Sequence, residues 1–185
     1  MSRSLRCVCE AHTPLLPKEL SPGLPALGCD TCRGDLLGLD DYRRWLDRFP
    51  QEALPATDSP AQVDPVDTTA TPVRKCPGCA QLMERLLSGS STDFRLDRCG
   101  PCQRLWMDAG EWDALVAGDA SRHLLELLSD GGQRRLREAA AHQRREAELR
   151  ARHGDATVDE LLRLRAWLAD QPNADILLSL LRSGW

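Results

Sequence analysis

Long apolar runs are absent from this sequence. No stretch approaches the roughly 18 apolar residues that a membrane-spanning helix needs, and residues 1–7 lack the apolar stretch of a signal peptide. Aromatic residues make up only 4% of the 185 residues, while 13 Gly and 12 Pro interrupt the chain. The absence of apolar runs leads us to expect a cytoplasmic protein. With so few aromatic residues the chain cannot build one large core, so we expect several small modules.

Cysteine, by contrast, is well represented, and its eight copies lie in four close pairs. In a reducing cytosol such grouping favours metal binding over disulfides. Four thiolates supplied by two tight turns are a typical ligand set for a structural zinc ion. We therefore predict two zinc ions per chain, one bound by Cys7, Cys9, Cys29 and Cys32 and the other by Cys76, Cys79, Cys99 and Cys102.

An internal repeat relates the two sets of ligands. Three cysteines of the first set recur 70 residues later, so that Cys9, Cys29 and Cys32 match Cys79, Cys99 and Cys102. The opening pairs differ, because Cys76-Pro-Gly-Cys79 is a CxxC whereas Cys7-Val-Cys9 lacks one residue. His12 lies three residues after Cys9, and imidazole also binds zinc, so His12 is the alternative to Cys7 as the fourth ligand.

Each repeat is predicted to form a β-hairpin followed by a short helix. In the second copy, residues 81–87 and 94–98 have strand character on either side of a turn at 88–91. In the first copy the hairpin should be more irregular, because its four prolines cannot donate to a ladder. Helices are expected from Leu39 or Asp40 to Phe49, and after Asp108, where Asp108 and Glu111 have capping-box spacing.

Between the repeats, residues 50–73 contain five prolines and no apolar periodicity. Such a segment should be an extended, mobile linker, so the modules are predicted to be independent or loosely docked. The sequence thus indicates a small α+β protein with four parts: a degenerate ribbon with a short helix (1–49), the linker (50–73), a ribbon with a short helix (74–119) and an all-α C-terminal region (120–185).

The C-terminal region contains several helical patterns. A leucine-rich segment at 121–129 precedes Gly131-Gly132, which should interrupt the helix, and an Arg/Ala/Glu helix follows at 133–152. Thr157 and Glu160 have capping-box spacing and should open the next helix, and a leucine-rich helix follows at 175–182. We expect these helices to form a hairpin, a three-helix cluster or an oligomer contact.

The second repeat also resembles a known family. Cys76-Pro-Gly-Cys79, Cys99-Gly-Pro-Cys102 and Leu105-Trp106-Met107-Asp108-Ala109-Gly110-Glu111 are similar to the prokaryotic zinc-ribbon family named after transcription factor IIB, whose pattern runs CPxC and then CPxCxGxWLDxGE. Residues 74–117 follow that pattern, although Arg104 replaces a family glycine; residues 6–49 resemble a degenerate copy that keeps Gly34 at that place. The resemblance implies a zinc-binding ribbon and, by the family's name, a link to transcription, but no activity.

Two features allow a functional and a structural interpretation. Asp108 and Glu111 could be a catalytic carboxylate pair, but helix capping explains their spacing, and four thiolates leave zinc no open position. Trp106 and Trp112 are predicted to pack against the zinc-binding turns and not to stack on nucleic-acid bases.

The Arg-rich helix at 133–152 is the best candidate for contact with nucleic acid. Its seven Arg and three Glu are also the pattern of a solvated, salt-bridged face. The formal net charge is −4 at pH 7, and two four-thiolate zinc sites would take it to about −8. An acidic whole does not suit general nucleic-acid binding, so only a local patch could serve.

Three functions remain open at this point. The first, which we favour, is a non-enzymatic zinc protein whose tandem ribbons act as an interaction or regulatory module, with a protein partner or self-association through the C-terminal helices. The second is a nucleic-acid or transcription-associated binder that uses the Arg-rich helix. The third is a zinc-thiolate redox switch, since Cys99-Gly-Pro-Cys102 is also a CxxC of the thioredoxin type.

Overall fold

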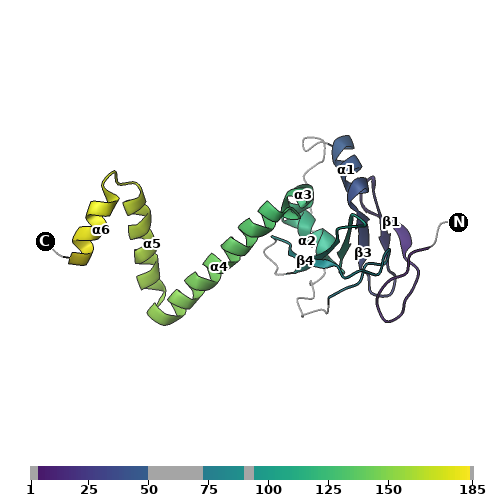
Figure 1. The fold of residues 1–185 in the computed structure, drawn as a ribbon, viewed down its shortest axis with the longest axis horizontal. Helices are drawn as coiled ribbons and strands as arrows, with labels where there is room; N and C mark the ends of the chain where they lie inside the picture. Colours follow the sequence, from purple (N-terminus) through teal and green to yellow (C-terminus); the bar gives the residue numbers. More distant parts are fainter. Residues whose placement is uncertain (1–3, 50–72, 90–93, 184–185) are drawn as a thin grey trace. The chain divides into compact units, whose positions relative to one another are not determined.

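The computed structural model describes residues 4–49, 73–89 and 94–183. Within these ranges the chain forms a mixed α+β fold with a helical C-terminal region, which confirms the predicted class (Figure 1). The elements are β1 (Leu16–Ser21), β2 (Leu24–Gly28), β3 (Asp35–Gly38), α1 (Leu39–Arg48), β4 (Glu84–Leu87), β5 (Arg95–Cys99), β6 (Arg104–Met107), α2 (Glu111–Ala117), the 3-10 helix η1 (Ala120–Arg122), α3 (Leu124–Leu127), α4 (Asp130–His153), α5 (Asp155–Ala169) and α6 (Ala174–Ser183).

The chain divides into two compact units, Met1–Leu136 and Arg137–Trp185, here called the body and the helical unit. The body includes α3 and the start of α4, and Leu124 and Leu128 are buried in its core. None of the helices in the described ranges is long and apolar enough to cross a membrane.

One antiparallel sheet in the body joins the two halves of the repeat. Its strand order is β1-β2-β3-β6-β5-β4, so each half contributes three neighbouring strands and β3 pairs with β6. The predicted independence of the two modules is therefore wrong, because backbone hydrogen bonds between β3 and β6 unite them. Of the predicted linker, only Val73 falls within the described residues; 50–72 lie outside them.

The pairing of β3 with β6 has a symmetry that follows from the repeat. Leu36 pairs with Trp106, and these two residues occupy equivalent positions 70 residues apart. The two modules are thus related by an approximate twofold axis at this pair, as the subunits of an isologous dimer are.

Successive side chains of β3 and β6 point to opposite faces of the sheet. Leu36 and Trp106 lie in one buried cluster, and Leu37 and Leu105 lie in the other. We call the first side the cysteine face, defined by the cluster of Cys7, Leu15, Cys29, Leu36, Cys76, Met83, Cys99 and Trp106. The opposite side, where the helices pack, is the helix face.

The helix face links the two modules a second time. Tyr42 of α1 is fully buried there; its hydroxyl donates to the Ser121 carbonyl at 2.7 Å and accepts from the Leu124 N–H at 3.3 Å. Trp112 of α2 also lies on this face, and its indole N–H donates to the Ser21 hydroxyl at 3.1 Å. The prediction that Trp112 packs against the cysteine turns is therefore wrong, whereas Trp106 does lie among the cysteines.

The first hairpin is more regular than its prolines suggested. β1 and β2 pair from Leu16 to Ser21 with a single irregularity between Glu19 and Ser21. Pro17 lies in β1 at the edge of the sheet, and Pro25 lies in β2 beyond the residues that pair with β3. Neither proline therefore removes a donor that the junction with β3 requires.

In the second hairpin, β4 begins at Glu84, three residues after the predicted start at 81. Leu82 forms only an isolated bridge with Lys75, which belongs to the cysteine turn. β5 spans Arg95–Cys99 and matches the predicted return strand to within one residue. Of the predicted turn at 88–91, residues 90 and 91 lie outside the described part of the chain.

The predicted break at Gly131 and Gly132 is wrong. Both glycines lie in the first turn of α4. A Cβ on Gly132 would come within 2.0 Å of the Glu126 carbonyl oxygen, so only glycine allows the chain to approach so closely. That approach places Gln133 beside β4, where its side-chain amide accepts the Leu87 N–H at 2.9 Å and donates to the Leu87 carbonyl at 3.0 Å.

In the helical unit, α5 begins at Asp155 with Gly154 before it. Thr157 therefore lies inside the first turn, and its predicted capping role is wrong. The predicted helices at 133–152 and 175–182 correspond to α4 and α6.

Replacing Gly132 with Ala should destabilise the body by about 1–3 kcal/mol, because the added methyl group overlaps a backbone carbonyl that cannot move freely. Gly131→Ala is the matched control: its nearest neighbouring atom is 3.8 Å away, so we expect no loss and up to about 1 kcal/mol of gain in helix stability. Urea unfolding of the reduced protein, followed by circular dichroism, measures both. Equal effects of the two substitutions would contradict the close contact.

Candidate metal centres

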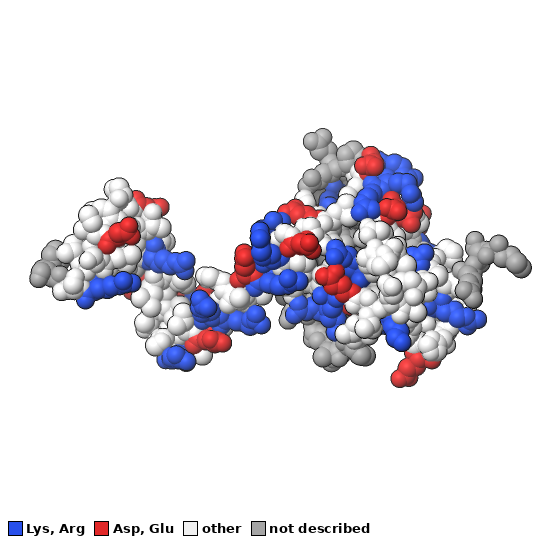
Figure 2. Space-filling view, in the orientation of Figure 1, with Lys and Arg blue, Asp and Glu red and all other residues white. Residues whose placement is uncertain are grey.

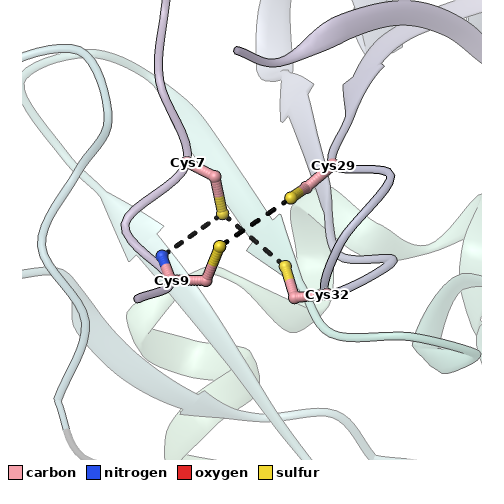
Figure 3. A group of neighbouring side chains, drawn as sticks. All are labelled: Cys7, Cys9, Cys29 and Cys32. Carbon is pink, nitrogen blue, oxygen red and sulfur yellow. Dashed lines mark hydrogen bonds between the residues drawn. The ribbon is translucent and has the colours of Figure 1, made fainter. Parts of the chain in front are cut away.

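The first cluster of cysteines is assembled from two turns that face each other across the first module. The Sγ atoms of Cys7 and Cys32 are 3.6 Å apart, those of Cys9 and Cys29 are 3.9 Å apart, and all four lie within 4.8 Å of one another (Figure 3). A tetrahedron with metal–sulfur bonds of about 2.3 Å has edges of about 3.8 Å. The four sulfurs therefore already have nearly the spacing that a tetrahedral ion requires.

The second cluster has the same construction. Cys76, Cys79, Cys99 and Cys102 also have all four Sγ atoms within 4.8 Å of one another, and those of Cys79 and Cys99 are 3.6 Å apart. Cys76 and Cys99 are buried on the cysteine face, whereas Cys79 is exposed. The structure thus brings all eight predicted ligands together in the two predicted groups.

A left-handed residue closes each cysteine turn. Arg33, Ala80 and Gln103 each follow the second cysteine of a CxxC and have φ of 58°, 61° and 49°. In the Cys7-Val-Cys9 turn the corresponding residue is His12, with φ of 47°, three residues after Cys9. The residue that is missing between the cysteines is thus compensated by two extra residues after them.

This wider turn settles the position of His12. The Cys7 N–H donates to the Thr13 carbonyl at 2.8 Å, just as the Cys76 N–H donates to the Gln81 carbonyl at 2.8 Å. The His12 ring nitrogen Nδ1 lies 3.3 Å from the Cys7 carbonyl oxygen, and the residue is not part of the cysteine group. The geometry therefore favours Cys7, and not His12, as the fourth ligand.

Burial and hydrogen bonds to sulfur shift the pKa values of the thiols. Burial alone would raise the pKa of Cys29, but hydrogen bonds from the backbone of Cys32 and the Thr13 hydroxyl lower it to about 6. The exposed Cys79 has a pKa lowered to about 7, chiefly by the backbone of Gln81. Burial raises the pKa of Cys7. Each cluster thus has one thiol that ionises near neutral pH, and binding of a cation would displace the remaining protons.

Asp108 does not cap α2, although Glu111 performs its half of the predicted capping box. The helix begins at Glu111 after the left-handed Gly110, and the Glu111 carboxylate accepts the Asp108 N–H at 2.7 Å. The Asp108 carboxylate instead accepts from Arg74 at 2.6 Å and from the Trp106 indole N–H at 2.9 Å. Both carboxylates thus have structural partners.

The contacts of Arg74 and Gly34 with Trp106 are the part of the site that the sequence did not predict. Arg74 lies over the Trp106 ring, 5.1 Å from its centre, and two residues before Cys76. Gly34 also lies against this ring: a Cβ there would be 2.4 Å from Trp106 Cζ2. In the sequence, Gly34 stands out only as the counterpart of a family glycine. Nothing in the sequence around Arg74 indicates that this residue contacts Trp106.

The Arg-rich helix is partly neutralised by acidic neighbours. Arg150 pairs with Glu146 and Asp159, each at 2.8 Å, and Arg135 pairs with Glu126. Figure 2 shows acidic and basic side chains interspersed with uncharged surface along the helices. This mixture is the expected pattern of a salt-bridged surface helix.

No protein-family model, curated protein or solved structure matches this chain. The resemblance to the family named after transcription factor IIB therefore rests on the cysteine turns and the residues after them. The two four-cysteine clusters are zinc-ribbon-like in their geometry.

The burial of Glu111, behind the second cluster, should make the stability of the body depend on pH. Burial raises its pKa to about 8 from an ordinary value of 4.5, so the folded chain holds the proton more tightly than the unfolded chain does. Its stabilising contribution is complete below about pH 4.5 and is lost as pH rises through about 8. Between pH 6 and 8, unfolding free energy should fall by about 2 kcal/mol more in the unaltered chain than in Glu111→Gln.

Urea unfolding at several pH values, with metal held constant, measures this difference. Glu138→Gln, at an exposed position on α4, is the control and should keep the slope of the unaltered chain. A Glu111→Gln variant with an unchanged pH slope would show that the carboxyl is not desolvated as described.

Proposed function

We propose that this chain is a zinc protein with two structural metal sites, whose body carries a helical unit that associates with a second copy of the chain. The observation that carries the proposal is the pair of four-cysteine clusters, in each of which all four sulfurs lie within 4.8 Å of one another. Soft thiolates in a tetrahedron suit zinc, and iron is the other common choice. Thiolates persist where cysteines are kept reduced, which supports a cytosolic setting.

A non-catalytic role for the metal follows from ligand count. Four protein thiolates close a tetrahedral site, whereas catalytic zinc keeps one position for water or substrate. The free energy of metal binding, about 10–16 kcal/mol for structural zinc, would add to the stability that the shared hydrophobic core supplies.

Metal analysis tests this part directly. The reduced protein, loaded with excess metal and then desalted, should contain two zinc ions per chain by mass spectrometry under native conditions. Cys7→Ser should lower that number to one, while His12→Ala should leave it at two, because His12 faces the Cys7 carbonyl and not the sulfurs.

A chain without bound metal would overturn the proposal. Iron in place of zinc would show that the clusters bind metal but that the proposed metal is wrong. Retention of two ions in Cys7→Ser but not in His12→Ala would reverse the ligand assignment. Rapid alkylation of Cys79 in the loaded protein would instead favour the redox switch, since Cys79 is the exposed ligand.

The case for association rests on the surface of the helical unit. Among its described residues only Val158 and Leu168 are buried apolar side chains. Eight large apolar side chains are exposed: Leu149, Leu161, Leu164, Trp167, Ile176, Leu178, Leu180 and Leu181. A groove of about 390 Å³ between α5 and α6 is lined mainly by apolar residues, among them Leu161, Leu164 and Leu178.

α6 in particular requires a further contact. It has ten residues, none of them buried, and isolated helices of fewer than about 12 residues are marginal in water. Its exposed apolar side chains include Ile176 and Leu181, at 60% and 66% exposure. Burying one such side chain stabilises by about 1.5–3 kcal/mol, so association would offset the cost of ordering this helix.

The charges of the unit favour a second copy as the occupant. Residues 137–183 contain eight Arg and eight Asp or Glu, so two copies meet without net repulsion. Asp175 and Arg182 lie near opposite ends of α6, and neither makes an ion pair within the described residues. If two α6 helices pair antiparallel about their midpoint, Asp175 lies opposite Arg182, and Ile176 lies opposite Leu181.

A nucleic-acid role is the second candidate, favoured by one observation. Arg137, Arg144, Arg145 and Arg152 share one side of α4 at helical spacing and make no ion pair within the described residues. The neutral charge of residues 137–183 supports self-association better, since phosphate binding depends on a net positive surface.

Sedimentation equilibrium of the zinc-loaded chain should give the mass of two chains at 0.5 M salt, because apolar contacts persist when charges are screened. Ile176→Glu with Leu181→Glu should give the mass of one chain without changing zinc content. Arg137→Glu with Arg144→Glu is the matched control and should remain a dimer. A monomer at all concentrations would overturn association, and bound nucleic acid released by salt and lost in the control variant would favour the second candidate.

A further inference from the structure

The two cysteine clusters share a single set of buried neighbours. Two cysteines from each cluster lie in the same buried group on the cysteine face, together with Trp106, Leu36, Leu15 and Met83: these are Cys7 and Cys29 from the first and Cys76 and Cys99 from the second. Clusters that belonged to independent ribbons would each have a core of their own. Here no boundary separates the side chains behind one cluster from those behind the other.

Within this shared group, Trp106 contacts residues beside the first cluster and residues beside the second. It lies opposite Leu36 at the approximate twofold axis and is almost fully buried. Its ring lies against Gly34, two residues after the ligand Cys32, so closely that a Cβ there would be 2.4 Å from Cζ2. The close approach ties the ring to the second cysteine turn of the first cluster.

Further contacts of Trp106 come from the second module. Arg74 covers the ring at 5.1 Å and lies two residues before the ligand Cys76. The Asp108 carboxylate accepts from both Arg74 and the indole N–H, at 2.6 and 2.9 Å. The ring is therefore held in one orientation by residues adjoining the second cluster while it packs on a turn of the first.

We propose that Trp106 couples the two metal sites, so that filling either one raises the affinity of the other. The inference rests on the proposed binding of two metal ions. Without a metal ion, a cysteine turn loses the bonds that fix its shape, and the Trp106 ring loses the rigid support of the neighbouring Gly34 or Arg74. A ring already fixed by one loaded site orders the turn beside the other site in advance, which is the physical origin of positive coupling.

The coupling is defined by a ratio of binding constants. Cobalt(II) titration, read from thiolate charge-transfer absorption and competed with zinc, gives the stepwise constants of the unaltered chain. Cys29→Ser with Cys32→Ser leaves only the second site, and Cys99→Ser with Cys102→Ser leaves only the first. We expect the product of the two constants in the unaltered chain to exceed the product of the single-site constants by on the order of tenfold, within the usual range of allosteric coupling.

Trp106→Leu tests the assigned residue, since leucine is what the first repeat has at the equivalent position, Leu36. In this background the ratio should fall to within about twofold of unity, while the variant still binds two ions. Gly34→Ala provides a second variant that displaces the ring from the first module and should act in the same direction if Trp106→Leu does not fold. Val116→Ala, at an exposed position of α2, is the control and should leave the ratio unchanged.

A ratio near unity in the unaltered chain would overturn the coupling, and an unchanged ratio in both Trp106→Leu and Gly34→Ala would overturn the role of the ring. Failure of the chain to bind any metal would refute the proposed function itself and is recognised by the absence of charge-transfer absorption in every variant.

Discussion

The hydrogen bonds between β3 and β6 are the constraint on which the body depends. They turn two small ribbons, each with three short strands, into one sheet whose central strands are buried on both faces. Because β3 and β6 are equivalent strands of the repeat, the same surface of each module is used, and the contact is self-complementary. A duplicated module that pairs with its own copy in this way obtains, within one chain, the core that a single ribbon is too small to build.

This arrangement divides the structural roles between the two faces. The helix face supplies aromatic and leucine packing through Tyr42, Trp112 and Leu124, which is ordinary hydrophobic stabilisation. The cysteine face is composed largely of cysteine side chains and the few residues behind them, so a metal ion bound by the sulfurs would add to its rigidity. Stability of the two faces should consequently respond to different conditions, the first to temperature and denaturant and the second also to metal and thiol chemistry.

Much of the local structure could be predicted from the sequence, and the assembly could not. Cysteine spacing is set by short-range turn geometry, which is why the two groups of four cysteines were predictable, and the 70-residue repeat showed that both have one construction. The β3–β6 pairing joins residues on either side of a proline-rich segment, and no local pattern records it. Gly132 illustrates the same limit: a glycine pair is typical of a break, and only the nearby Glu126 carbonyl shows that it permits close packing inside a helix. Asp108 has the spacing of a cap, but a distant partner, Arg74, takes its carboxylate.

The contact of Gln133 with Leu87 bears on how the sheet ends. When β3 and β6 pair, the outermost strands are β1 and β4, the first strand of each module, and an open strand edge invites further chains to add. The two edges are protected differently: β1 carries Pro17 and Lys18, residues typical of guarded edges, while β4 has its Leu87 N–H and carbonyl taken by an amide from α4. The second protection comes from outside the repeat. A shortened chain that ended before α4 would keep both cysteine clusters but leave this edge available, and would be exposed to strand-by-strand aggregation from one side only.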